Sequence, residues 1–148
     1  MQIVYRFRHR RFVENDIETG EEVYDSKGLG YFSTKEKCLE LIPFYLQLPG
    51  FKDYPNAFTI EEIEADVDYF NDEIGNFEEY VYELSHEYYD GEYDNESFLG
   101  FYSTLQNAER AEMKFRLDED FINHPEGFCI SKYEIDKKEW TEGFFTWN

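Results

Sequence analysis

The sequence predicts an α+β protein made of two tandem strand–strand–helix–strand repeats that pack with pseudo-twofold symmetry. The first observation is a six-residue stretch that occurs twice, 70 positions apart, as LGYFST at 29–34 and LGFYST at 99–104. The second observation is that this offset continues along the chain, with 10 identities when residues 29–70 are compared with 99–140. An internal repeat of this length predicts one supersecondary unit used twice.

Each repeat is predicted from alternating strands, turn residues and a helix start. In the first repeat we expect a strand at 2–9, a polar hairpin tip at 14–22, a strand at 23–32, a helix from Ser33 and a strand from Phe58. In the second repeat we expect strands at 81–88 and 98–102, a helix from Ser103 and a strand at 128–135. Upstream of the six-residue stretch the offset becomes 77, so the first repeat has the longer opening hairpin.

Both helices are expected to begin at a serine. Ser33 with Glu36, and Ser103 with Gln106, have the spacing of a capping box, in which side chains satisfy the free backbone N–H groups of the first turn. Pro43 should kink the first helix or end it early, because proline removes a hydrogen bond and clashes with the preceding turn.

The predicted domain organisation follows the repeats. Residues 1–70 form the first repeat, 71–80 an acidic linker and 81–148 the second repeat. Since a domain of about 70 residues is marginally stable alone, we expect the repeats to share one compact unit. The closing segment, 140–148, is rich in aromatic residues and should dock on the body of the protein.

Charge is the strongest global signal in the sequence. With 34 acidic and 14 basic residues, the chain has a formal charge of −20. This excludes direct binding to nucleic acids or anionic membranes, which requires a positive surface, and favours a partner protein with a basic surface. No apolar run is long enough to span a membrane and the N-terminus lacks a signal-peptide pattern, so a cytoplasmic protein is expected.

No pattern in the sequence predicts a cofactor or a metal site. Cys38 and Cys129 stand at apolar-patterned positions, one in a predicted helix and one in a predicted strand, and form no CxxC pair, so we expect two buried, reduced thiols. His9 and His86 occupy equivalent positions in the two repeats, and we interpret them as structural hydrogen-bonding residues. The alternative is a small enzyme or ligand-binding domain with a pocket between the repeats near these two histidines. A nucleophile motif, a phosphate loop and calcium-ligand spacing are absent from the sequence.

The second repeat resembles a family of small uncharacterised bacterial and phage domains. The residues that carry the resemblance are VYELSHEYYD at 81–90, LGFYST at 99–104, HPEGFCISKYEID at 124–136 and WTEGF at 140–144. The first repeat matches at LGYFST and at LPGFKDYPNAFTIEEIEAD, 48–66, but lacks the closing WTEGF. The resemblance supports the duplication and the fold, and it implies no functional residues.

The sequence therefore predicts a non-enzymatic, acidic protein-binding protein. It could inhibit a basic or nucleic-acid-binding protein, as an immunity protein or a phage counter-defence protein does. DNA mimicry requires the acids to cluster, because evenly spread charge falls about fourfold short of the charge density of DNA. A structural homo-oligomer is a further alternative, and the oligomeric state stays open. We expect the partner-binding residues to be Tyr69, Asp72, Glu73, Tyr88, Tyr89, Asp90 and Tyr93.

Overall fold

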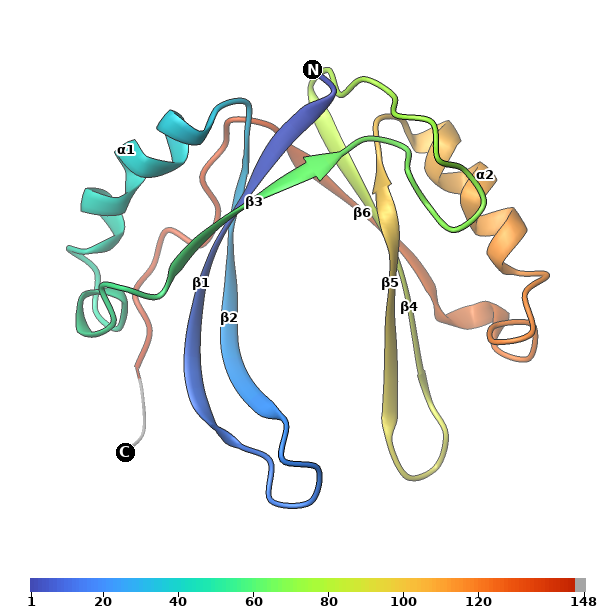
Figure 1. Cartoon of the computed structure of the whole chain (residues 1–148), viewed down its shortest axis with the longest axis horizontal. Helices are drawn as coiled ribbons and strands as arrows, with labels where there is room; N and C mark the ends of the chain where they lie inside the picture. Colours follow the sequence, from blue (N-terminus) through green and yellow to red (C-terminus); the bar gives the residue numbers. More distant parts are fainter. Residues whose placement is uncertain (146–148) are drawn as a thin grey trace. The chain divides into compact units, whose positions relative to one another are not determined.

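The computed structural model describes residues 1–145 and has the predicted α+β architecture (Figure 1). Within these residues it contains two three-stranded antiparallel sheets and two α-helices. The elements are β1 (Ile3–Asn15), β2 (Glu22–Phe32), α1 (Lys35–Tyr45), β3 (Phe58–Glu64), β4 (Tyr80–Tyr89), β5 (Asp94–Tyr102), α2 (Leu105–Phe115) and β6 (Phe128–Glu134), with short 3₁₀ turns at Phe51–Asp53 and Pro125–Gly127. None of the helices in this part of the chain is long and apolar enough to cross a membrane.

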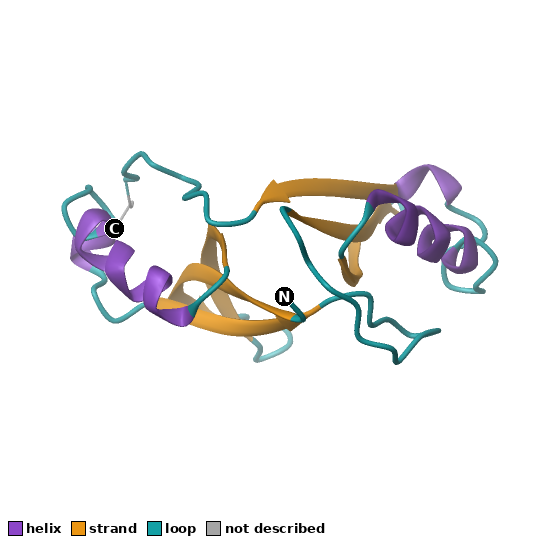
Figure 2. Ribbon diagram, turned by 90° about the horizontal axis from the view of Figure 1, so that it is seen from above, coloured by secondary structure: helices purple, strands orange, loops and turns teal. Residues whose placement is uncertain are grey.

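The two sheets have the same strand order. One is β2-β1-β3 and the other is β5-β4-β6, so the first strand of each set is central. Each sheet has one helix lying across one face (Figure 2). The opposite face of each sheet therefore presents its alternate side chains away from that helix.

The repeated six-residue stretch forms the same β-bulge in both sheets. The register shifts between Phe7 and Arg8 on β1, and 77 residues later between Leu84 and Ser85 on β4. The glycine that follows the bulged leucine has a positive φ of 127° at Gly30 and 135° at Gly100. A side chain at either glycine would also collide with neighbouring atoms. Only glycine fits this backbone without strain, which explains the LG pair of both stretches.

The chain forms two compact units that do not follow the predicted repeats. The β1 unit contains Val4–Glu62 and the segment that begins at Asp136, whereas the β4 unit contains Met1–Ile3 and Ile63–Ile135. The segment after β3 thus belongs to the β4 unit, and the segment after β6 belongs to the β1 unit.

We call this arrangement, in which each unit contains a segment that follows the last strand of the other, the exchange of segments. One backbone hydrogen bond in each unit attaches the exchanged segment. The amide of Asp66 donates to the carbonyl of Phe101, and the amide of Asp136, 70 residues later, donates to the carbonyl of Tyr31, both at 2.8 Å. The expected linker at 71–80 is consequently part of the β4 unit, where Phe77 is fully buried and its amide donates to the carbonyl of Met1.

Each unit has its own aromatic core between sheet and helix. In the β1 unit the core residues are Phe7, Leu29, Phe32, Cys38, Tyr45, Phe51 and Phe144. In the β4 unit they are Leu84, Tyr102, Ala108, Ala111, Phe115 and Phe121. The expected docking of the closing segment is confirmed by Phe144, and 146–148 lie outside the described residues. The prediction of a buried Cys129 is wrong, because this residue lies exposed on edge strand β6.

The helix starts lie one residue later than the capping boxes predict. The N-caps are Thr34 and Thr104, whose side chains accept hydrogen bonds from the amides of Lys37 and Asn107. Ser33 and Ser103 are therefore not caps. Pro43 does not end α1 early, because α1 has the same length as α2, 11 residues. Pro43 lies in the last turn of α1.

Candidate functional site

An aspartate binds the serine that precedes each helix. In the β1 unit, the Asp136 carboxylate accepts hydrogen bonds from the Ser33 amide at 2.8 Å and from the Ser33 hydroxyl. The Lys37 Nζ, one turn into α1, lies 2.9 Å from Asp136 Oδ2 and 3.0 Å from the Ser33 hydroxyl. Burial acts to raise the pKa of the Asp136 carboxyl, but the bonds from Ser33 and Lys37 outweigh it and hold that pKa below its usual value.

The β4 unit has the same aspartate and serine but lacks the lysine. The Asp66 carboxylate accepts the Ser103 amide at 2.8 Å and the Ser103 hydroxyl at 2.6 Å. Asn107 occupies the position that corresponds to Lys37, and Asp66 has no ion-pair partner among residues 1–145. Asp66 is only 8% exposed, so it is a buried carboxylate without a cation.

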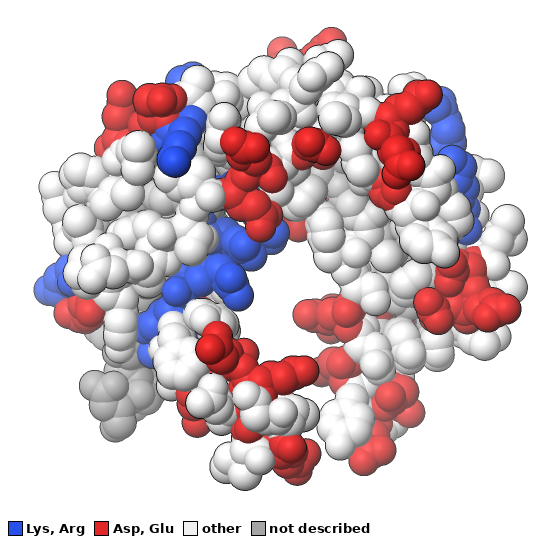
Figure 3. All heavy atoms as spheres, viewed as in Figure 1, with Lys and Arg blue, Asp and Glu red and all other residues white. Residues whose placement is uncertain are grey.

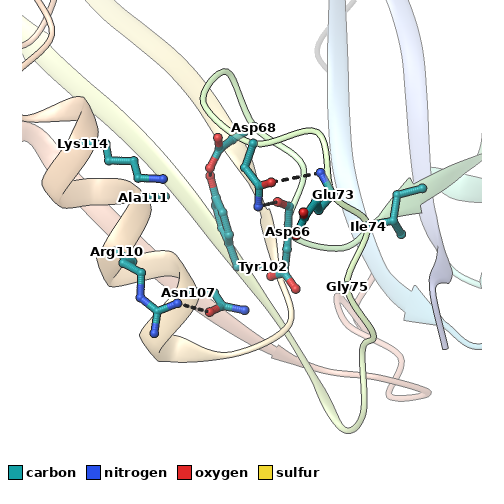
Figure 4. Close-up of a pocket in the computed structure, with 11 residues that line it drawn as sticks. Asp66, Asp68, Glu73, Ile74, Gly75, Tyr102, Asn107, Arg110, Ala111 and Lys114 are labelled. Carbon is teal, nitrogen blue, oxygen red and sulfur yellow. Dashed lines mark hydrogen bonds between the residues drawn. The ribbon is translucent and has the colours of Figure 1, made fainter.

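A pocket of about 280 Å³ lies beside this carboxylate, between α2 and the loop that follows β3 (Figure 4). Asp66, Asp68, Tyr102, Asn107, Arg110 and Ala111 line it, together with Asn71, Glu73, Ile74, Gly75 and Lys114. The β1 unit has a corresponding pocket lined by Asp136, Lys138, Phe32, Lys37, Glu40 and Leu41, each 70 residues from one of the first six. The two pockets share their position in the fold and differ in their charges.

The side chains around the first pocket hold its shape by hydrogen bonds. Asp68 accepts from the Tyr102 hydroxyl at 2.7 Å and from the Phe70 amide at 2.7 Å. Burial, with Asp68 as a second cause, raises the pKa of Tyr102, so this hydroxyl stays protonated as a donor. The Arg110 guanidinium donates to the Asn107 side chain at 3.4 Å. The Lys114 ammonium has no hydrogen-bonding or ion-pair partner in the described part of the chain.

The pocket does not resemble a catalytic or metal centre. The Tyr102 hydroxyl lies beside the Asp68 carboxylate, but burial and Asp68 raise its pKa, so it is a hydrogen-bond donor and not an activated nucleophile. No group of three or more His, Cys, Asp or Glu side chains within residues 1–145 could hold a metal ion. The arrangement can instead bind a charged group, because carboxylates lie on the loop side and cationic side chains on the helix side.

Four of the predicted partner-binding residues lie at the β4–β5 hairpin. Tyr89 and Tyr93 are 65% and 61% exposed, whereas Tyr88 is half-buried and stacks on His124 with ring centroids 3.9 Å apart. Asp90 holds the turn by accepting the Glu92 and Tyr93 amides at 2.9 and 2.8 Å. These hydrogen bonds, from Tyr93 first, lower the pKa of the Asp90 carboxyl.

The other three predicted residues lie in the loop that follows β3. Tyr69 is 83% exposed and packs its ring edge-on against Phe70, while Asp72 and Glu73 are exposed. Figure 1 shows this loop beside α2 and the hairpin turn at the opposite end of β4 and β5, so the structure does not bring the seven residues together. Glu73 also lines the pocket between α2 and this loop, which we call the α2 pocket.

His9 and His86 lie in different units, and each is 1% exposed. His9 Nε2 lies 3.0 Å from the Tyr54 carbonyl, and His86 Nε2 lies 2.7 Å from the His124 carbonyl, 70 residues after Tyr54. Because a carbonyl oxygen only accepts, each Nε2–H donates, and each Nδ1 is buried without a hydrogen-bond partner.

Asp66 and Asp136 match at the repeat offset of 70, but the sequence alone did not show what they do. The informative signal was a difference within the helix start, where Lys37 is replaced by Asn107. The lysine in one copy and the neutral residue in the other indicate that only one of the two aspartates has a cation from its own unit as a partner.

The comparisons with known proteins agree with the resemblance found in the sequence. Residues 79–144 match the model of a domain of unknown function, DUF7336, which covers the chain from just before β4 to the docked Phe144. This part of the chain is thus similar to an uncharacterised domain family. No curated protein and no solved structure matches the chain.

Proposed function

We propose that the protein is a non-enzymatic, acidic binding protein whose partner is a protein with a basic surface. The observation that carries the proposal is the uneven charge of the two units. The β4 unit has 20 acidic residues against 4 basic ones, a formal charge of −16, whereas the β1 unit has 14 against 10, a charge of −4. A concentrated negative surface attracts a positively charged partner and speeds its association.

Two glutamates that lie opposite each other in the β4–β5 hairpin support the proposal. Glu87 lies directly opposite Glu96 in the strand register, and neither side chain has an ion-pair partner in the described residues. At the corresponding places in the β1 unit, Arg10 lies opposite Ser26. Figure 3 shows acidic side chains over the β4–β5 hairpin and a band of basic ones along β1. Like charges opposite each other destabilise a sheet, and a basic partner would relieve that repulsion.

Exposed aromatic side chains of the same hairpin supply the anchoring contacts. Tyr89 and Tyr93 protrude beside the acidic pair, and tyrosine is among the residues that contribute most to interface affinity. Tyr69, Asp72 and Glu73 form a second acidic and aromatic contact on the loop after β3.

The charge favours an inhibitor of a basic or nucleic-acid-binding protein, of the immunity or phage counter-defence type. The solvent-accessible surface area of the chain is 9785 Å². If about half of it belongs to the β4 unit, one net charge covers about 300 Å², against about 100 Å² for duplex DNA. The surface therefore supports electrostatic steering better than full DNA mimicry. We place this activity in the cytoplasm, where Cys38 and Cys129 stay reduced.

We also infer that the chain arose by tandem duplication of a strand–strand–helix–strand module. Support comes from the equal strand orders, from the bulges at Gly30 and Gly100, and from the equivalent hydrogen bonds of Asp66 and Asp136. The two copies also differ in charge: residues 81–148 have 16 acidic and 6 basic residues, and residues 1–70 have 14 and 8.

Affinity capture from a lysate of the native host, at low and high salt, tests the proposed binding. The bait is the full chain, compared with the double variant Glu87→Gln/Glu96→Gln and with Tyr89→Ala. We expect one basic protein in stoichiometric amount that is released by high salt and depleted several-fold with both variants.

A matched control removes the same charge from the β1 unit. Glu18 and Glu21 are exposed in the β1–β2 hairpin tip, and Glu18→Gln/Glu21→Gln should capture the partner as well as the unmodified chain. Equal loss with both double variants would show that net charge alone, and not the β4–β5 hairpin, is responsible. Capture that is insensitive to salt and to all variants would refute the proposal.

A further inference from the structure

The α2 pocket of the β4 unit contains a buried carboxylate that has no ion-pair partner in the described chain. Asp66 is 8% exposed beneath the loop that follows β3, and its carboxylate oxygens accept the amide and the hydroxyl of Ser103. A Cβ added to Gly75 would lie 1.9 Å from Asp66 Oδ2, which shows how closely the backbone covers the carboxylate. A buried carboxylate without a cation is costly to maintain, and such a group is typical of a binding site.

The β1 unit shows which chemical group fits this place. There the Lys37 ammonium lies 2.9 Å from Asp136 Oδ2 and 3.0 Å from the Ser33 hydroxyl, in a pocket built from corresponding positions. Asp66 and Ser103 have the same hydrogen-bonded arrangement as Asp136 and Ser33. The only group of that three-part cluster missing from the β4 unit is therefore a primary ammonium.

The lining of the pocket suits the rest of a lysine side chain. Ile74, Ala111 and the Tyr102 ring supply apolar surface next to Asp66, and aliphatic lysine carbons pack on such surface while the ammonium reaches a polar group. Asp68 and Glu73 add negative charge to the lining. Asn107 stands at the position of Lys37 but is shorter and uncharged, so it supplies no ammonium to Asp66 (Figure 4).

Two cationic side chains oppose this attraction and set a limit on affinity. Arg110 and Lys114 lie on the exposed side of α2, so the lining carries three carboxylates and two cations. The net charge remains negative, and the buried carboxylate is the less screened group.

We propose that this pocket binds the ammonium group of a lysine side chain, which takes the place that Lys37 Nζ occupies in the β1 unit. The ammonium donates hydrogen bonds to Asp66 Oδ2 and to the Ser103 hydroxyl, and the lysine carbons lie along Ile74 and Ala111. This site is separate from the β4–β5 hairpin and goes beyond the proposed function.

The test is a titration of the ¹⁵N-labelled full chain with Nα-acetyl-lysine amide, followed by NMR. The Ser103 amide donates to Asp66 and reports on the site, and the Ser33 amide is the internal control because its aspartate already binds Lys37. We expect a saturable shift of the Ser103 signal in the millimolar range and no shift at Ser33. The Nε-acetylated and Nε-trimethylated probes, which lack the charge or the N–H donors, should each bind at least tenfold more weakly.

Three variants make the result specific. Asn107→Lys places an internal ammonium in the site and should abolish the Ser103 shift in a fully folded protein. Lys37→Asn opens the corresponding site and should make Ser33 respond to the probe, while Lys114→Gln should tighten binding at Ser103. If a small diamine binds far more tightly than the lysine probe, the ligand of the site is a free polyamine and not a lysine side chain, and the proposal is wrong.

The outcomes separate this proposal from the proposed function. An unmoved Ser103 signal, or binding that persists in Asn107→Lys, refutes the lysine site and leaves the partner capture by the hairpin unaffected. Conversely, loss of capture in Glu87→Gln/Glu96→Gln leaves the titration of Ser103 unchanged.

Discussion

Asp66 holds Ser103 through two hydrogen bonds, from the serine amide and hydroxyl to the two carboxylate oxygens, although 37 positions separate the residues. Asp66 has a φ of 65°, in the left-handed region, and Asp136 repeats both the conformation, with a φ of 67°, and the contact to Ser33. Aspartate tolerates this backbone better than most residues. The pair thus fixes the path of each exchanged segment at the point where it reaches the helix start.

The exchange of segments predicts that the closing segment stabilises the β1 unit. Phe144 packs edge-on against Phe51 with ring centroids 4.9 Å apart, and its amide donates to the Pro49 carbonyl. We expect Phe144→Ala to lower the free energy of unfolding by about 3 kcal/mol, measured by urea denaturation. The neighbouring Phe145 is 90% exposed, so Phe145→Ala should change it by less than about 0.5 kcal/mol. Equal effects of the two changes would contradict the docking of this segment.

The Asp136 cluster predicts a dependence of stability on acid pH. Because the bonds from Ser33 and Lys37 outweigh burial and lower the pKa of Asp136, its stabilising contribution is complete above the unfolded pKa of about 4 and is lost as the pH falls through the lowered folded value. Asp136→Asn should cost about 1 kcal/mol at pH 7, since the side chain is about one-third exposed. The difference in the free energy of unfolding between Asp136→Asn and the unmodified chain should therefore be smaller at pH 3 than at pH 7, and a constant difference would argue against the ionised pair.

The glutamates of the β4–β5 hairpin predict a conflict between stability and binding. Glu87 and Glu96 repel each other across the strands, so Glu87→Gln should raise the free energy of unfolding by about 0.5 kcal/mol at low salt. The gain should shrink in high salt, because exposed charges are screened. The same substitution should slow association with the basic partner. A loss of stability would show that Glu87 has a favourable contact instead of a repulsive one.

The sequence predicted the strands and helices, but it left the arrangement of the sheets open and did not predict how the ends of these elements are connected in space. The LG pair at each bulge and the aromatic core positions depend on local backbone and alternation, which a sequence displays directly. The exchange of segments could not be predicted. The position of Asp66 along the chain does not show whether it binds Ser33 of its own repeat or Ser103 of the next. The helix start was misplaced by one residue because serine and threonine are adjacent, and both are common caps.

The candidate site was the least predictable part of the molecule. Motif searches look for residues that match known patterns, whereas this pocket is defined by a mismatch, the change from Lys37 to Asn107 at a repeated position. Its buried carboxylate became apparent only with the 8% exposure of Asp66 and the lining of the pocket.

His9 predicts a second, milder pH dependence near neutrality. Burial, with a smaller effect of Lys27, lowers the pKa of His9 against the opposing effects of the Tyr54 carbonyl and Asp25. The neutral imidazole is therefore favoured in the folded state, and its contribution to stability is complete above the unfolded pKa of about 6.5 and decreases as the pH falls through the folded value. The ring protons of His9, followed by NMR, should titrate below pH 6.5. In His9→Gln the amide can still donate to Tyr54, so the loss of stability between pH 7.5 and pH 5.5 should become smaller while the fold is retained. A His9 ring that titrates above pH 6.5, or an unchanged pH profile in the variant, would mean that the buried ring carries its charge in the folded protein.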